Sequence, residues 1–220
     1  MNSSARRKCF SAALGCILLA FCLNVSGQNF SPKMQAAYDA CMAMRKAIGS
    51  GSLAGLKAAT KSFKACHTKD FSTLRCLSPL PLSLDGHFVF DEIFADSLIA
   101  GRDVYKFAQR YAESRTVRGV SSTGFIFDKT CAVRAQASVK YSFPSKGRQE
   151  LAIVTEPGGM VTLRVYDNTH DKWYNDTEDV KTGKISRSLV IELPPDERSV
   201  LEIEIFNTTD NDISFVILSN

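Results

Sequence analysis

The spacing of hydrophobic residues changes from a helical period to a strand period at about residue 122. Before that point apolar side chains recur every three to four residues, whereas after it they alternate with polar ones. This pattern predicts an α+β fold in which an N-terminal helical hairpin and short helices precede an antiparallel β-sandwich. We expect three segments: a signal peptide over residues 1–27, an α-helical region over 28–121 and a β-sandwich domain over 122–220.

Two amphipathic helices are predicted over residues 31–66. A serine followed by a proline at 31–32 indicates a helix start, because serine caps free amide groups and proline suits the first turn. A Gly-Ser-Gly-Ser run at 49–52 separates the two periodic stretches, which predicts a hairpin. Two shorter helices are predicted over residues 91–100 and 103–113.

The second half of the chain has the pattern of a series of short strands. Residues 133–143 alternate strictly between apolar and polar side chains, which predicts one strand. Six to eight short strands separated by turn residues are typical of an antiparallel β-sandwich. The further strand-like runs cover residues 151–154, 161–166, 189–193, 201–206 and 213–218.

The N-terminus has the features of a secretory signal peptide. Basic residues at 6–8 precede an apolar run over 12–23, and small residues at 25–27 suit a cleavage site. The mature chain is therefore expected to begin near Gln28 and to be exported to the periplasm, the cell surface or the medium. Cleavage before a glutamine resembles leaders that are common among Bacteroidetes.

The charge of the chain changes when this leader is removed. The leader holds three basic residues and no acidic ones, so the net charge falls from +4 to +1. The N-terminal third of the mature chain stays basic, but it has few aromatic residues that could stack on bases, and we expect no nucleic-acid binding. No later segment approaches the ~20 consecutive apolar residues that cross a bilayer, so we expect no transmembrane segment in the mature chain.

Four cysteines follow the leader, and their even number favours disulfides in an exported chain. If the helical hairpin turns near residue 50, Cys66 lies ~10 Å along the helix axis from the residue that faces Cys41, which disfavours a direct bridge between them. Bridges from Cys76 to either of these cysteines fit the register better, and Cys131 is the fourth candidate. A zinc site is disfavoured because the close cysteine pair of structural zinc sites is missing.

Four strand segments occur in a recognisable order: Val139–Phe143, Leu151–Val154, Val161–Asp167 and Ile213–Ile217. In this order they resemble the pre-peptidase C-terminal domain, which is found beside secreted bacterial hydrolases. The resemblance covers about residues 130–220 and implies a jelly-roll-like sandwich. It also implies an accessory or binding module, since such domains are generally not catalytic.

The segment after residue 166 carries the candidate binding chemistry. His170, Trp173 and Tyr174 lie in one predicted loop, where aromatic side chains can stack on a ligand such as a sugar. The only tryptophan has a competing place in the core of the sandwich, which the sequence favours. Carboxylates in the same loop are hard oxygen ligands of the kind that Ca²⁺ prefers, and the candidates are Asp167, Asp171, Asp176, Glu178 and Asp179.

No motif of a known catalytic centre stands out. The chain lacks a G-x-S-x-G elbow, and a nucleophilic Cys131 with His170 as its base is less simple than disulfide formation. We therefore expect a non-catalytic binding or accessory protein, whose partner is a glycan or a protein at the cell surface or in the periplasm and which needs no cofactor, calcium being the one candidate. The alternatives are a small secreted hydrolase and a structural component of a cell-surface assembly, in which a sheet edge accepts a partner strand.

Overall fold

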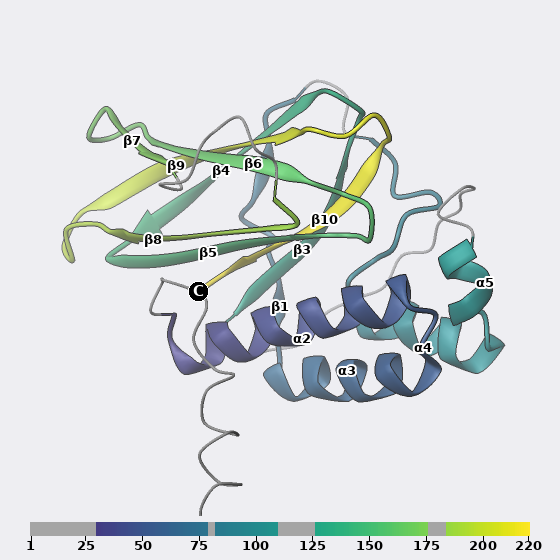
Figure 1. Ribbon diagram of the computed structural model, residues 1–220. Helices are drawn as coiled ribbons and strands as arrows, with labels where there is room; N and C mark the ends of the chain where they lie inside the picture. Colours follow the sequence, from purple (N-terminus) through teal and green to yellow (C-terminus); the bar gives the residue numbers. More distant parts are fainter. Residues whose placement is uncertain (1–29, 79–81, 110–125, 176–183) are drawn as a thin grey trace, which may run out of the picture.

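The computed structural model describes residues 30–78, 82–109, 126–175 and 184–220. Helices and two β-sheets form three stacked layers, in which the helices cover one face of the first sheet and the second sheet covers its other face (Figure 1). The α+β class predicted from the change of hydrophobic period is confirmed. The predicted signal peptide and the predicted boundary after residue 121 lie outside the described residues.

The helical layer contains α2 (Pro32–Gly49), α3 (Leu53–Cys66), α4 (Glu92–Gly101) and α5 (Val104–Gln109). Helices α2 and α3 lie side by side and are joined by a short turn. Each of the three longer helices begins at a side chain that accepts a hydrogen bond from a backbone amide of its first turn, contributed by Ser31, Ser52 or Asp91. Among the described helices no stretch is both long and apolar enough to cross a membrane.

The first sheet, sheet A, has the order β1 (Lys69–Asp70), β3 (Phe127–Val133), β10 (Ile213–Ser219), β5 (Arg148–Thr155) and β8 (Ser186–Glu192). The second, sheet B, has the order β2 (Arg75–Cys76), β4 (Ser138–Lys146), β9 (Arg198–Asn207), β6 (Val161–Asp167) and β7 (Lys172–Asn175). Strands β1 and β3 pair in parallel, while the other neighbouring pairs of these described strands are antiparallel.

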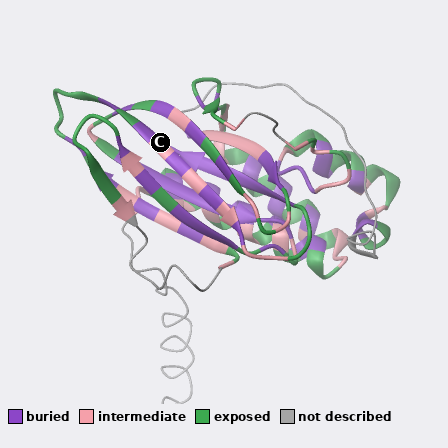
Figure 2. Ribbon diagram, turned by 90° about the horizontal axis from the view of Figure 1, so that it is seen from above, coloured by how far each residue is buried: buried purple, intermediate pink, exposed green. Residues whose placement is uncertain are grey.

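Sheet A is buried on both faces. One set of alternate side chains in its central strands packs with the helices: Ala152, Val154, Val216 and Leu218. The other set packs with sheet B: Leu151, Ile153, Phe215 and Ile217. Sheet B has one buried and one open face, because β4 and β9 alternate between buried and more exposed residues (Figure 2).

The single strand predicted over residues 133–143 is wrong, because two strands from different sheets share this segment. Strand β3 ends at Val133 in sheet A, and β4 begins at Ser138 in sheet B. The chain turns between them at Gln136, whose φ of 50° lies in the left-handed region. The apolar alternation continues through this turn, so the period alone does not show where the chain changes sheet.

Three short strands were missed by the sequence analysis. Strands β1 and β2 lie within the region predicted as helical, and they extend one edge of each sheet. Strand β7 occupies part of the predicted loop after residue 166 and forms the opposite edge of sheet B. Segments of two to four residues are too short to show an alternation.

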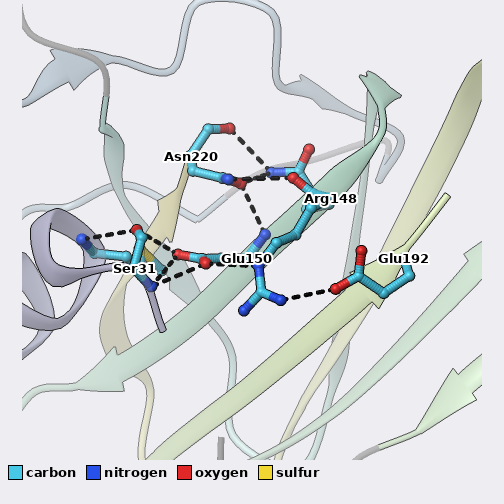
Figure 3. A network of polar contacts seen from close by, with 7 residues as sticks. Ser31, Arg148, Glu150, Glu192 and Asn220 are labelled. Carbon is cyan, nitrogen blue, oxygen red and sulfur yellow. Dashed lines mark hydrogen bonds and ion pairs between the residues drawn. The ribbon is translucent and has the colours of Figure 1, made fainter. Parts of the chain in front are cut away.

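A buried carboxylate attaches the start of α2 to sheet A. Glu150 on β5 is 1% exposed and accepts hydrogen bonds from the Ser31 amide at 2.9 and 3.0 Å and from the Ser31 hydroxyl at 2.7 Å (Figure 3). Arg148 Nε donates to the same carboxylate at 3.0 Å, and its Nη1 donates to Glu192 at 2.7 Å. The negative charge lies at the positive end of the helix dipole, which favours this placement.

A second buried carboxylate attaches the segment before α4 to sheet A. Glu156, 3% exposed, accepts hydrogen bonds from the amides of Phe88 and Ser214 at 3.0 Å each and contacts His87 Nδ1 at 2.8 Å. The Ser214 hydroxyl donates to the Phe88 carbonyl oxygen at 2.6 Å. These contacts satisfy the buried acid and fix a connecting segment against β10.

Candidate binding site on the open face of sheet B

The open face of sheet B carries two adjacent rows of side chains that cross its strands. The strand register places Lys140, Glu204 and Arg164 opposite one another in one row. The next row consists of Ser142, Glu202, Tyr166 and Trp173. We call these seven residues the open-face site. Neighbouring strands lie ~4.8 Å apart, so the longer row spans about 14 Å of the surface.

Trp173 is the most exposed aromatic group of this site. It lies on β7 opposite Tyr166, with the ring centroids 4.8 Å apart and the planes at 38°, and its side chain is 47% exposed. The guanidinium carbon of Arg164 lies 4.4 Å from the centroid of the Trp173 ring, a cation–π contact. The sequence preference for a tryptophan in the core is therefore wrong.

Charged and polar groups surround this aromatic pair. Glu204 lies between Arg164 at 3.7 Å and Lys140 at 3.6 Å. Glu202 accepts a hydrogen bond from the Asn168 side chain at 2.7 Å. One row of the face therefore has a carboxylate acceptor between two cationic donors, and the neighbouring row has a second carboxylate and an aromatic ring that is open to solvent.

Tyr166 has a second contact that orders the rim of the site. Its hydroxyl donates a hydrogen bond to Asp171, and this bond, with smaller contributions from burial and nearby acids, raises the pKa of Tyr166. The phenol stays neutral and the ring keeps its orientation against Trp173. Asp171 itself has a positive φ of 50°, in the turn that leads into β7.

The turn between β6 and β7 is fixed by a buried acid. Asp167 accepts hydrogen bonds from the amides of Thr169 and His170 at 3.0 and 3.3 Å and from the Ser199 hydroxyl, and it lies 2.7 Å from His170 Nδ1. His170 Nε2 contacts Glu197 at 2.9 Å. This network, together with the strand pairing, holds β7 and its tryptophan in place.

The predicted ligand residues separate in the structure. Trp173 faces solvent, whereas Tyr174 packs against the sandwich core with Lys172 Nζ 4.6 Å from its ring centroid. Both ring nitrogens of His170 contact carboxylates, those of Asp167 at the end of β6 and of Glu197 just before β9. Of the predicted residues, only Trp173 belongs to the open-face site.

The calcium cluster is not assembled within the described residues. Asp167 is fully buried and hydrogen-bonded, and Asp171 is bonded to Tyr166. Asp176, Glu178 and Asp179 lie outside the described residues. In the part of the chain that the structure describes, no group of three or more histidine, cysteine or acidic side chains is arranged to hold a metal ion.

Sequence reasoning missed the other six residues of the site, which are Arg164, Tyr166, Lys140, Ser142, Glu202 and Glu204. A signal for the first two was present, because the alternation in Val161–Asp167 places Arg164 and Tyr166 on the face opposite Leu163 and Val165. Their position beside Trp173 depends on the pairing of β6 with β7, which the sequence analysis did not predict.

The cysteine and histidine pair considered for catalysis is not formed. Cys131 is buried in β3, and burial raises the pKa of its thiol to about 12 despite a hydrogen bond with Tyr141. His170 lies in the turn before β7 of sheet B, where its two ring nitrogens contact Asp167 and Glu197, whereas β3 belongs to sheet A. All four candidate disulfide cysteines are free thiols in the structure.

No family model matches the chain, and no curated protein matches it in sequence. Among solved structures, the chain is similar to a mitogen from Yersinia pseudotuberculosis, with 13% identity over 43% of this chain and 84% of that one and a TM-score of 0.34. The pre-peptidase C-terminal domain of a collagenase from Bacillus anthracis has 9% identity over 42% and 89%, with a TM-score of 0.30.

A periplasmic inhibitor of g-type lysozyme from Salmonella Typhimurium, PliG, has 8% identity over 47% of this chain and 93% of that one, with a TM-score of 0.30. These similarities do not assign the chain to a family.

Proposed function

We propose that the chain is an exported, non-catalytic binding protein that recognises glycans through the open-face site. The observation that carries this proposal is the solvent-exposed ring of Trp173, held against Tyr166 and Arg164 at the edge of an otherwise charged sheet face. An exposed tryptophan with fixed neighbours is a large apolar surface that loses little conformational freedom when it binds a ligand.

The chemistry of the site fits a sugar. A pyranose has apolar C–H faces that pack on aromatic rings and hydroxyl groups that both donate and accept hydrogen bonds. Trp173 offers the ring, Glu202 and Glu204 are acceptors, and Arg164 and Lys140 are donors. In binding sites for small ligands, an aromatic surface supplies contact area, and a few polar groups around it fix the orientation of the ligand.

A protein partner fits the same face less well. Charged residues are depleted from the cores of protein interfaces, whereas Lys140, Arg164 and Glu204 form a continuous charged row across three strands. Apolar contact area is concentrated at Trp173 and Tyr166, which matches a ligand of one or a few sugar units.

The contacts of two histidines with carboxylates of the same chain support a role without catalysis. His87 is held by Glu156 against sheet A, and both nitrogens of His170 contact carboxylates. Among the described residues, the side-chain contacts of both histidines are to carboxylates and not to a serine or cysteine that they could activate. Hydrolysis of a bound glycan by the purified chain would reject this part of the proposal.

The only tryptophan of the chain gives a direct test, because tryptophan emission then reports on Trp173 alone. The chain from Gln28 is titrated with a panel of neutral and acidic oligosaccharides, and a saturable change in emission is expected for at least one of them. No saturable binding by any panel member would overturn the glycan assignment and turn attention to a protein partner.

Calorimetry on variants then tests the site itself. Arg164→Ala removes the cation over the ring and is expected to weaken binding by about 10-fold or more. Lys172→Ala is the matched control, since this lysine lies on the same edge strand but over Tyr174 rather than on the open face. Equal loss in both variants would place the ligand elsewhere.

A further inference from the structure

The open face of sheet B extends beyond the open-face site, along β4 and β9. Two residues past the row that contains Trp173, Pro144 lies directly opposite Val200, and both side chains point outward. Two residues further, Lys146 lies directly opposite Arg198 on the same face. We call Lys146 and Arg198 the cationic pair. Successive residues rise ~3.4 Å along a strand, so this pair lies about 14 Å beyond the Trp173 row.

The cationic pair has no acidic partner among the described residues. Both side chains are exposed, and neither makes an ion pair within the part of the chain that the structure describes. Glu197, which precedes Arg198, contacts His170 Nε2 at 2.9 Å instead. Like charges directly opposite each other on neighbouring strands destabilise a sheet. The arrangement therefore suits a site in which a ligand supplies the negative charge.

The whole open face has an excess of positive charge. Five cations and two acids point outward from the described strands of sheet B: Arg75, Lys140, Lys146, Arg164, Arg198, Glu202 and Glu204. Glu204 already lies between two of these cations, at 3.6 and 3.7 Å, and Glu202 accepts a hydrogen bond from Asn168 at 2.7 Å. The acids of the face therefore leave the cationic pair uncompensated, and the face as a whole favours an anionic ligand.

An apolar patch lies between the cationic pair and the aromatic ring. Val200 is 44% exposed and Trp173 is 47% exposed. Asn168 lies beside this patch, since its amide donates a hydrogen bond to the Val200 carbonyl oxygen at 3.1 Å and its side chain reaches Glu202. The path from the ring crosses two strand spacings of ~4.8 Å and runs about 14 Å along the strands, or roughly 17 Å in all. An oligosaccharide stacked on Trp173 can follow this path to the cationic pair.

We infer that the cationic pair is a second subsite, which binds an oxyanion of the same ligand, and that the glycan is therefore acidic and carries carboxylate or sulfate groups. This inference rests on the proposed glycan function and names the class of glycan. The planar guanidinium of Arg198 can donate two parallel hydrogen bonds to an oxyanion, and the ammonium of Lys146 adds a second positive charge. Stacking at Trp173 and charge pairing about 17 Å away fix the direction in which the ligand lies on the sheet.

Matched pairs of acidic and neutral oligosaccharides test the inference by calorimetry at low ionic strength. Oligogalacturonides are compared with their methyl esters, and sulfated galactan oligosaccharides with their unsulfated counterparts. We expect the acidic member of at least one pair to bind about 10-fold or more tightly. Arg198→Ala and Lys146→Ala should each reduce this ratio toward one and leave the affinity for the neutral member unchanged. Lys57→Ala, which removes the same charge from the exposed side of α3 across sheet A, is the control and should keep the ratio.

Inorganic sulfate tests the cationic pair without a sugar. When millimolar sulfate replaces chloride at constant ionic strength, we expect the Tm of the unmodified chain to rise by roughly 1–3 °C, and that of Arg198→Ala by less than half as much. Sulfate also stabilises folded proteins in general, because it is excluded from their surfaces. An equal rise in both chains would therefore reflect only this general effect and would overturn the subsite.

The outcomes separate this inference from the proposed function. Equal affinity for the acidic and neutral members of both pairs would overturn the acidic glycan, while the proposed function would stand on the binding of the neutral sugars. If no oligosaccharide binds, the proposed function and the acidic glycan both fail. The sulfate result then decides by itself whether the cationic pair binds oxyanions.

Discussion

Each of the two sheets has five strands among the described residues, and the two sheets differ in where their polar side chains lie. The central strands of sheet A are nearly continuous apolar runs, and their few buried carboxylates are saturated with hydrogen bonds that attach other segments to the sheet. The central strands of sheet B alternate, and their carboxylates remain on the open face, where Glu204 is 22% exposed and pairs at 3.6 to 3.7 Å. Glutamate side chains thus attach other segments to sheet A, whereas those of sheet B lie on a surface that a ligand can reach.

This difference favours ligand binding on the open face of sheet B rather than on sheet A. Side chains of sheet A are fixed by packing on both faces, so they cannot change without a cost in stability. The outward side chains of sheet B have no layer above them among the described residues. They can therefore vary in a way that suits a ligand without disturbing the core. The comparison predicts a large stability effect for changes in sheet A and a small one for matched changes on the open face.

The largest expected effect comes from the buried acid at the helix side of sheet A. Glu156→Ala removes the acceptor of the Phe88 and Ser214 amides and the partner of His87, leaving buried donors without partners. We expect a loss of about 3–5 kcal/mol in the free energy of unfolding, measured with denaturant. Glu202→Ala on the open face is the control, with an expected loss below about 1 kcal/mol.

A matched pair of valines isolates packing from hydrogen bonding. Val216 in β10 is fully buried between sheet A and the helices, whereas Val200 in β9 is 44% exposed. Val216→Ala is expected to cost about 1.5–3 kcal/mol through lost burial and a residual cavity, and Val200→Ala no more than about 0.5 kcal/mol. Similar costs at both positions would mean that the open face is covered in solution.

The sequence predicted the parts of the fold that depend on local chemistry. The serine and proline at residues 31–32 located the start of α2, and the runs beginning at residues 151, 161 and 213 located the cores of β5, β6 and β10. Capping and period are properties of neighbouring residues, so a single sequence contains them.

The rest depends on contacts between residues that are distant in sequence. Ser31 and Glu150 are 119 positions apart, and nothing in either segment indicates that they meet. The prediction that Trp173 is buried failed for a related reason: its exposure follows from its place opposite Tyr166 on the open face of sheet B, which the pairing of β7 with β6 determines. Of the open-face site the sequence singled out only Trp173, because the other six residues come to lie beside it only through the pairing of β4, β6, β7 and β9.

The smallest expected effect is a difference in pH dependence between the two histidine contacts. For His87, burial lowers the pKa, but the Glu156 contact outweighs it and the net shift is upward. For His170, hydrogen bonds with Asp167 and then Glu197 raise the pKa. A raised pKa in the folded state contributes stability that is complete below the ordinary value of ~6.5 and is lost as the pH rises through the raised value.

Tm is therefore expected to fall as the pH rises from 6.5 toward 8, and His87→Gln and His170→Gln each remove part of this slope. His87 contacts a buried acid in sheet A, whereas one partner of His170 is the exposed Glu197 and is screened by solvent, so His87→Gln should remove the larger part. A larger effect of His170→Gln would show that the turn beside Trp173, rather than the helix-facing side of sheet A, governs the response to pH.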